Sequence, residues 1–186
     1  MKLEAEFIAK DNLLYTVSGT PVPVNGITLV SGEDICAAGS DSAEAQRVLA
    51  DGALHAGIPV GVTVPWTLVE PQPEQYNEEA LAVLRDFLKR MEELGQHAVI
   101  VPVAEQADDE EERDRLTAAM RHTARRIKDC RSVIGFAVPV CLLGAPEAFV
   151  QELSHKHEHY VFFAEKKAAV ASGTESVCRE NGLILY

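Results

Sequence analysis

The chain has 186 residues, a length that fits one domain with a sizeable buried core. Hydrophobic residues make up 47% of it and charged residues 25%, as is usual for globular proteins. The net charge of −12 disfavours nucleic acids and anionic membranes as partners, because both are negatively charged. Residues 1–12 lack a signal-peptide core, and no apolar run reaches the ~18 residues of a membrane span. We therefore expect one cytoplasmic domain over residues 1–186.

Apolar, β-rich runs alternate with amphipathic helical patterns along the chain. Residues 12–24 predict a β-hairpin that turns at Ser18 and Gly19, within an N-terminal hairpin region 1–25. Strands are predicted at 26–30, 58–66, 97–103, 133–140, 159–165 and 183–186. Helices are predicted at 42–55, 77–94, 109–129, 146–156 and 172–180. Residues 26–186 are thus predicted to form a series of βα units.

The predicted strands are apolar throughout instead of alternating, which indicates burial on both faces. With helices between them, such strands form a parallel sheet that is either open and doubly wound or rolled into a barrel. No GxGxxG motif or phosphate-binding loop follows a strand, so motifs give no support to a nucleotide-binding fold. The number of βα units is below the eight of a complete barrel. The fold class is therefore α/β, built from parallel βα units.

The segment 65–77, PWTLVEPQPEQYN, carries the most specific motif of the chain. It resembles the Trp-x-x-x-Glu-Pro-x-x-Gly-x-Tyr-Asn loop of cellulase-like and β-galactosidase-like enzymes, which are clan A glycoside hydrolases. Glu74 departs from this pattern, because it stands where those families have glycine. The order of elements over 26–136 is similar as well. The resemblance implies a shortened glycosidase (β/α) barrel of about six strands with an N-terminal β-hairpin.

The same resemblance implies a binding site in this loop. Trp66, Glu70 and Tyr76 would then contact a small carbohydrate. Glu70 has a second interpretation, as an acid that braces the loop. Aromatic residues make up only 6% of the chain, which is sparse for a protein that binds long glycans.

Glycosidases of this kind use two carboxyl groups, a proton donor and, in retaining enzymes, a nucleophile about 5 Å away. The donor normally ends the fourth strand, where this chain has Val140 and Cys141. The nucleophile normally ends the seventh strand, in a sequence similar to HYVFFAEK, so Glu165 is its counterpart. Glu105, just after the third strand, is a weaker candidate for the acid. No activating base lies beside Cys141 in the sequence, so we interpret it as an inert thiol.

Three histidines alternate in the segment SHKHEHY: His155, His157 and His159. On a strand all three imidazoles would share one face, as in a site for a divalent transition metal. On a helix only His155 and His159 would share a face. The other interpretation is a polar helix end, where partly protonated histidines suit the helix dipole. No cofactor is expected apart from such a metal.

Three functions remain open at this point. The leading hypothesis is a glycoside-hydrolase-like barrel without hydrolytic activity that serves as a small carbohydrate-binding or protein-interaction module. The second is an active small glycosidase, with Glu165 as nucleophile and an acid from Glu105 or from a second subunit. The third is a metal-binding protein that uses the three histidines. Since a shortened parallel barrel has open strand edges, we also expect a homo-oligomer.

Overall fold

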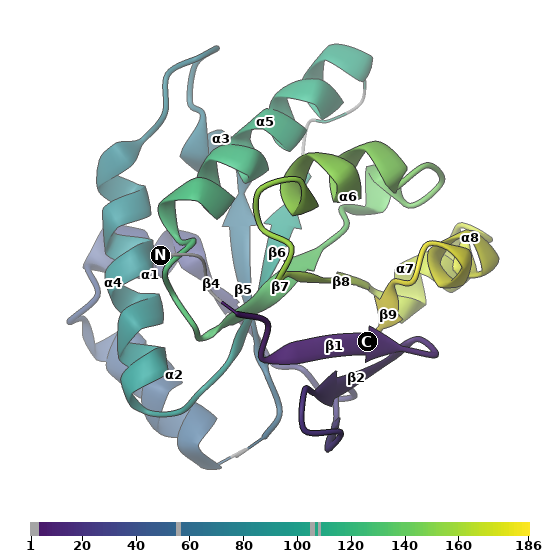
Figure 1. Ribbon diagram of the computed structural model, residues 1–186. Coiled ribbons are helices and arrows are strands. Elements are labelled where there is room, and N and C mark those ends of the chain that lie inside the picture. Colours follow the sequence, from purple (N-terminus) through teal and green to yellow (C-terminus); the bar gives the residue numbers. More distant parts are fainter. Residues whose placement is uncertain (1–3, 55–56, 105–106, 108) are drawn as a thin grey trace.

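The computed structural model describes residues 4–54, 57–104, 107 and 109–186. Its centre is a six-stranded parallel sheet in the order β4-β5-β6-β7-β8-β9, so each strand pairs with the next one along the chain (Figure 1). These strands are β4 (Leu29–Ser31), β5 (Val60–Pro65), β6 (Ala98–Val103), β7 (Val133–Ala137), β8 (Val161–Ala164) and β9 (Ile184–Leu185). The prediction of an α/β fold with six parallel strands is confirmed.

Helices cover one side of this sheet, and in Figure 1 they form an arc around it. They are α1 (Gly32–Ala38), α2 (Ala43–Leu54), α3 (Trp66–Val69), α4 (Glu78–Glu93), α5 (Glu110–Arg126), α6 (Glu147–Ser154), α7 (Lys166–Ala171) and α8 (Glu175–Glu180). Helices α1, α3 and α7 are absent from the prediction, because their four to seven residues show no clear helical period; the predicted helix 172–180 is confirmed as the shorter α8. No described helix has the length and apolar character that crossing a membrane would require.

The N-terminal region forms a separate antiparallel sheet of three strands: β1 (Phe7–Lys10), β2 (Leu13–Thr16) and β3 (Pro21–Val22). The predicted turn at Ser18 and Gly19 joins β2 to β3. A second hairpin, which the sequence did not reveal, joins β1 to β2 through Asp11 and Asn12. These two residues have φ angles of 52° and 58°, as in the type I′ turns that suit two-residue hairpin loops.

Two apolar clusters bury the two faces of the parallel sheet. The larger one packs the helices against the sheet and includes Phe87 of α4 and Phe136 of β7. The smaller one lies between the parallel sheet and the N-terminal sheet, and includes Phe7, Val99 and Phe163. The strands are thus buried on both faces, as their uniformly apolar sequences predict.

The parallel sheet is open within the described part of the chain. Its two end strands, β4 and β9, form no pair with each other there. The six strands therefore have the sequential parallel order of a (β/α) barrel without the hydrogen-bonded closure of a complete one. The two free edges and the carboxyl ends of the strands are therefore the candidate binding regions of this sheet.

Candidate functional site

Glu165 lies at the carboxyl end of β8, the kind of position where parallel α/β sheets carry their binding residues. It directly precedes α7, yet its carboxylate makes no capping hydrogen bond to that helix. The residue is exposed. The backbone of Tyr186 is hydrogen-bonded to both chain neighbours of Glu165, to the Ala164 oxygen at 3.1 Å and to the Lys166 N–H at 2.9 Å. Burial and then the charge of Glu165 raise the pKa of the Tyr186 hydroxyl to about 12. An exposed carboxylate can accept hydrogen bonds from the hydroxyl groups of a polar ligand.

The neighbouring strand β7 ends without a carboxylate. Residues Val140–Leu142 form a 3₁₀ turn soon after it. Val140 is 55% exposed, and Cys141 is half-buried against the helix-side core. Neither side chain can protonate a leaving oxygen as a carboxylic acid does. Glu165 therefore has no acidic partner at the end of the adjacent strand.

Trp66 and Glu70, two of the predicted carbohydrate contacts, are buried on the helix side of the sheet. Trp66 is 3% exposed and Glu70 is 4% exposed. The Glu70 Oε1 atom accepts hydrogen bonds from the Glu74 backbone N–H at 3.0 Å and from Arg115 Nε at 3.4 Å. The guanidinium of Arg115 also lies over the Trp66 ring, 4.9 Å from its centroid. Glu70 thus braces the loop against α5, which leaves both side chains little surface for a sugar.

Tyr76, the third predicted contact, packs on the same helix. Its ring stacks on His122 of α5, with centroids 3.7 Å apart and planes 6° from parallel. Trp66 and Tyr76 follow β5, which is separated from β8 by two strands. No hydrogen bond, ion pair or ring contact joins either side chain to Glu165 among the described residues. The structure thus does not bring the loop and Glu165 together, and Glu105 lies outside the described residues.

The three histidines lie in turns between α6 and β8, so neither the strand nor the helix geometry applies to them. His155 is exposed, whereas His157 is buried. The rings of His157 and His159 have their centroids 6.1 Å apart. Among the described residues, no group of three or more His, Cys, Asp or Glu is placed to hold a metal ion. The predicted metal site therefore has no geometric support.

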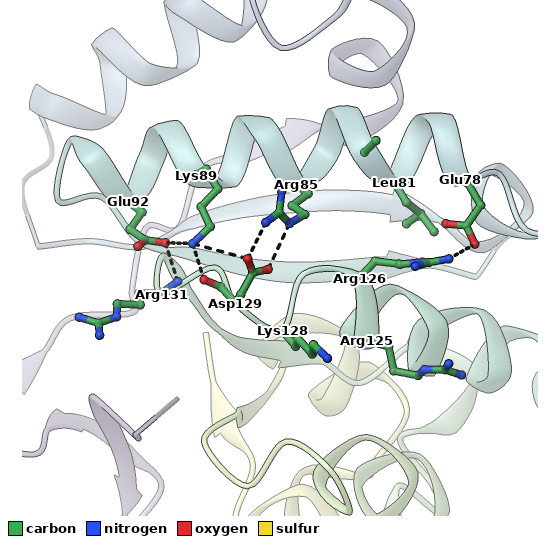
Figure 2. A pocket seen from close by; sticks show the side chains of 11 residues that line it. Glu78, Leu81, Arg85, Lys89, Glu92, Arg125, Arg126, Lys128, Asp129 and Arg131 are labelled. Carbon is green, nitrogen blue, oxygen red and sulfur yellow. Dashed lines mark hydrogen bonds and ion pairs between the residues drawn. The ribbon is translucent and has the colours of Figure 1, made fainter. Parts of the chain in front are cut away.

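A charged groove of about 820 Å³ lies between α4 and the residues that lead from α5 into β7 (Figure 2). Most of its charges neutralise each other. Asp129 accepts from both Arg85 Nε at 3.1 Å and Arg85 Nη2 at 2.5 Å, which lowers the pKa of Asp129. Lys89 donates to Glu92 at 2.9 Å. The Arg85–Asp129 pair and a hydrogen bond from Lys89 to the Asp129 backbone oxygen tie α4 to the connection before β7. Most of this groove is therefore a structural seam between these two segments.

No protein-family model matches the sequence, and comparison with curated proteins gives no match either. Solved structures do match. The catalytic domain of a mannanase from Streptomyces sp. SirexAA-E aligns with a TM-score of 0.66 and 11% identity, over 100% of this chain and 61% of that one. A glycoside hydrolase family 5 mannosidase from Rhizomucor miehei aligns with a TM-score of 0.58 and 13% identity, over 87% and 56%. GH5_18 from Bifidobacterium longum subsp. longum, in complex with Manb1-4GlcNAc, aligns with a TM-score of 0.55 and 11% identity, over 76% and 43%.

These similarities concern the fold. The resemblance to clan A glycoside hydrolases is confirmed at that level, because the aligned structures include family 5 glycoside hydrolases and a mannanase. The chain spans less than two thirds of the length of each of them, from 43% to 61%. At identities of 11% to 13%, these alignments do not show that this chain hydrolyses or binds carbohydrates.

Proposed function

We propose that this chain is a glycoside-hydrolase-like barrel that lacks hydrolytic activity and binds a small carbohydrate at the carboxyl end of β8. The observation that carries the proposal is that only one of two paired strands is followed by a carboxylate. β8 is followed directly by Glu165, whereas β7 leads into Val140 and Cys141. Glycosidic bond cleavage by this chemistry needs a second carboxyl group, and losing a general acid removes about 10²–10⁴-fold in rate.

The proposal of carbohydrate binding rests on the polar groups at the carboxyl end of β8. The exposed Glu165 carboxylate can accept hydrogen bonds from sugar hydroxyls, and the backbone of Tyr186 is hydrogen-bonded to Ala164 and Lys166 on either side of it. One of the structures with a similar fold is in complex with Manb1-4GlcNAc, which suggests that disaccharide as a probe. Since Trp66 and Tyr76 are occupied by contacts with α5, the site has few aromatic surfaces and suits a small ligand.

Titration with Manβ1-4GlcNAc, followed by the amide signals of the protein, tests the proposal. We expect saturable shifts confined to the segments around Glu165 and Tyr186. Glu165→Gln should weaken binding about tenfold or more, because hydrogen bonds to a charged group contribute about 1.5–3 kcal/mol. Glu180→Gln is the matched control, since it removes another exposed carboxylate from the nearby helix α8. No saturable binding, or equal weakening by both variants, would contradict the proposal.

An active small glycosidase with Glu165 as its nucleophile is the alternative. The exposed position of Glu165 at a strand end favours it. It requires a proton donor, which the described residues at the end of β7 do not supply. That donor would have to be Glu105 or a residue of a second subunit.

A further inference from the structure

Four residues gather at the end of the sheet opposite Glu165, and we call them the basic cluster: Arg125, Lys128, Lys156 and His157. Arg125 lies in the last turn of α5, and Lys128 follows it before β7. Lys156 and His157 lie between α6 and β8. Both connections lead into a strand, so they meet at the amino ends of β7 and β8, which are paired and parallel.

Two hollows open at the basic cluster, and both are lined by Arg125, Lys156 and His157. One has a volume of about 380 Å³ and adds Lys128 and Arg126 to its lining. The other also has about 380 Å³ and lies toward α6. Volumes of this order fit the space that small-molecule sites offer. The shared residues therefore face space that a small ligand can occupy.

The cations of the basic cluster lack carboxylate partners. Their neighbour Arg126 donates to Glu78 at 2.5 Å, but Arg125, Lys128 and Lys156 form no ion pair with any described carboxylate. In Figure 2 no dashed line reaches Arg125 or Lys128, although both lie next to the paired charges of the groove. All three cations are exposed. The chain has 29 acidic and 17 basic residues, so this local positive excess opposes its overall charge and would attract an anion.

His157 gives a second, independent sign of a ligand. It is 6% exposed, and its Nε2 atom is buried without a hydrogen-bond partner among the described residues. Buried polar atoms without partners are rare in folded proteins. Burial, and then the positive charges of His159, Lys128, Lys156 and Arg125, lower the pKa of His157 to about 4. The ring is therefore neutral at pH 7 and lies in a positive environment.

We propose that the basic cluster binds a tetrahedral dianion: a phosphate group, either free or carried by a small phosphate ester. The Arg125 guanidinium offers a planar, two-pronged donor, and Lys128 and Lys156 offer mobile charges. In its Nε2–H tautomer, His157 adds a hydrogen-bond donor. The site lies at the opposite end of the strands from the proposed carbohydrate site. The two proposals are independent, and either can fail without the other.

Calorimetric titration at low salt with two probes, inorganic phosphate and glycerol 3-phosphate, tests this proposal. We expect saturable binding that weakens as salt is added, because exposed charges are screened. Arg125→Gln should weaken it about tenfold or more, as for loss of a charge-assisted hydrogen bond. Replacing Arg125, Lys128 and Lys156 together by glutamine should abolish it. These side chains are exposed, so the triple variant should keep the melting curve of the parent.

Lys167→Gln is the control, because it removes an exposed cation of α7 near the other end of β8 and should leave the affinity unchanged. Equal affinity for inorganic phosphate and glycerol 3-phosphate would show that the site recognises the phosphate group alone, so that free phosphate suffices as the ligand. Tighter binding of glycerol 3-phosphate would identify an ester. Failure of both probes to bind saturably, or undiminished binding by the folded triple variant, would overturn the proposal.

Discussion

Gly135, in the middle of β7, has the least room for a side chain among the glycines whose surroundings the structure describes. A Cβ atom placed there would lie 1.7 Å from the backbone oxygen of Val161 in β8. We predict that Gly135→Ala destabilises the protein by about 3 kcal/mol, because the two strands must separate to admit the methyl group. Urea unfolding measures this. Gly144→Ala is the control: no atom lies within 4 Å of its Cβ position, so its effect should stay within about 0.5 kcal/mol.

Glu74 stands where the similar glycosidase loops have glycine, and its backbone explains that preference. Its φ angle is 61°, in the left-handed region that costs a residue with a side chain about 1 kcal/mol. Glu74→Gly should therefore raise the free energy of unfolding by about 0.5 kcal/mol, the gain being reduced by the flexibility of glycine in the unfolded chain. Glu74→Ala keeps the strained angle and should bring no such gain. If both variants melt alike, the strain argument is wrong.

The sequence located Glu165 at a strand end and offered Glu70 as a brace of its loop, but it did not show what surrounds Trp66 and Tyr76. A motif shows which residues occur in a loop, and Trp66 and Glu70 do form a connected group in it. It does not show that Arg115, 45 residues further along the chain from Glu70, lies against both side chains. The basic cluster was missed for a similar reason. Its lack of partners becomes visible only when the carboxylates of Glu78 and Asp129 are seen paired with other arginines.

At the scale of elements, the long helices α4 and α5 could be predicted, whereas three of the short ones, α1, α3 and α7, could not. Asn77 caps α4 by accepting from the Ala80 N–H at 3.1 Å, and α5 begins with a capping box between Asp109 and Glu112. Such caps, and apolar residues that recur at helical spacing, can be recognised from the local sequence. Helix α3 has four residues and is stabilised by contacts with α5, which local sequence does not encode.

The link between α4 and the connection before β7 depends on Asp129, which binds Arg85 through two hydrogen bonds. We predict that Asp129→Asn lowers the free energy of unfolding by about 0.5–1 kcal/mol, a small amount because both side chains are partly exposed. The loss should shrink in 1 M salt, where the Debye length is about 3 Å. Asp86→Asn, which removes a looser contact 3.9 Å from Arg85, should have a smaller effect. Urea unfolding of both variants at two salt concentrations measures these losses. Equal losses of unfolding free energy for Asp129→Asn and Asp86→Asn would refute the importance of the Arg85–Asp129 pair.

At the scale of the whole molecule, the open sheet has two unpaired edges, β4 and β9, in the described part of the chain. Exposed parallel edges favour association, so we predict a homodimer or a larger assembly. Sedimentation at micromolar concentration should give a mass of at least two chains. Leu29→Lys, a charge placed on the exposed edge strand β4, should shift the mass toward one chain. A parent protein that sediments as a single chain would contradict this prediction.

The central claim is that the molecule keeps the α/β architecture of family 5 glycosidases without their hydrolysis. The rate of hydrolysis of Manβ1-4GlcNAc, whose sugar leaving group needs a proton, tests it most directly when measured for the parent and for Glu165→Gln. We predict equal rates for the two proteins, both at the level of buffer alone, because the end of β7 offers no proton donor. A parent rate above that background, lost in Glu165→Gln, would contradict the claim and establish an active glycosidase.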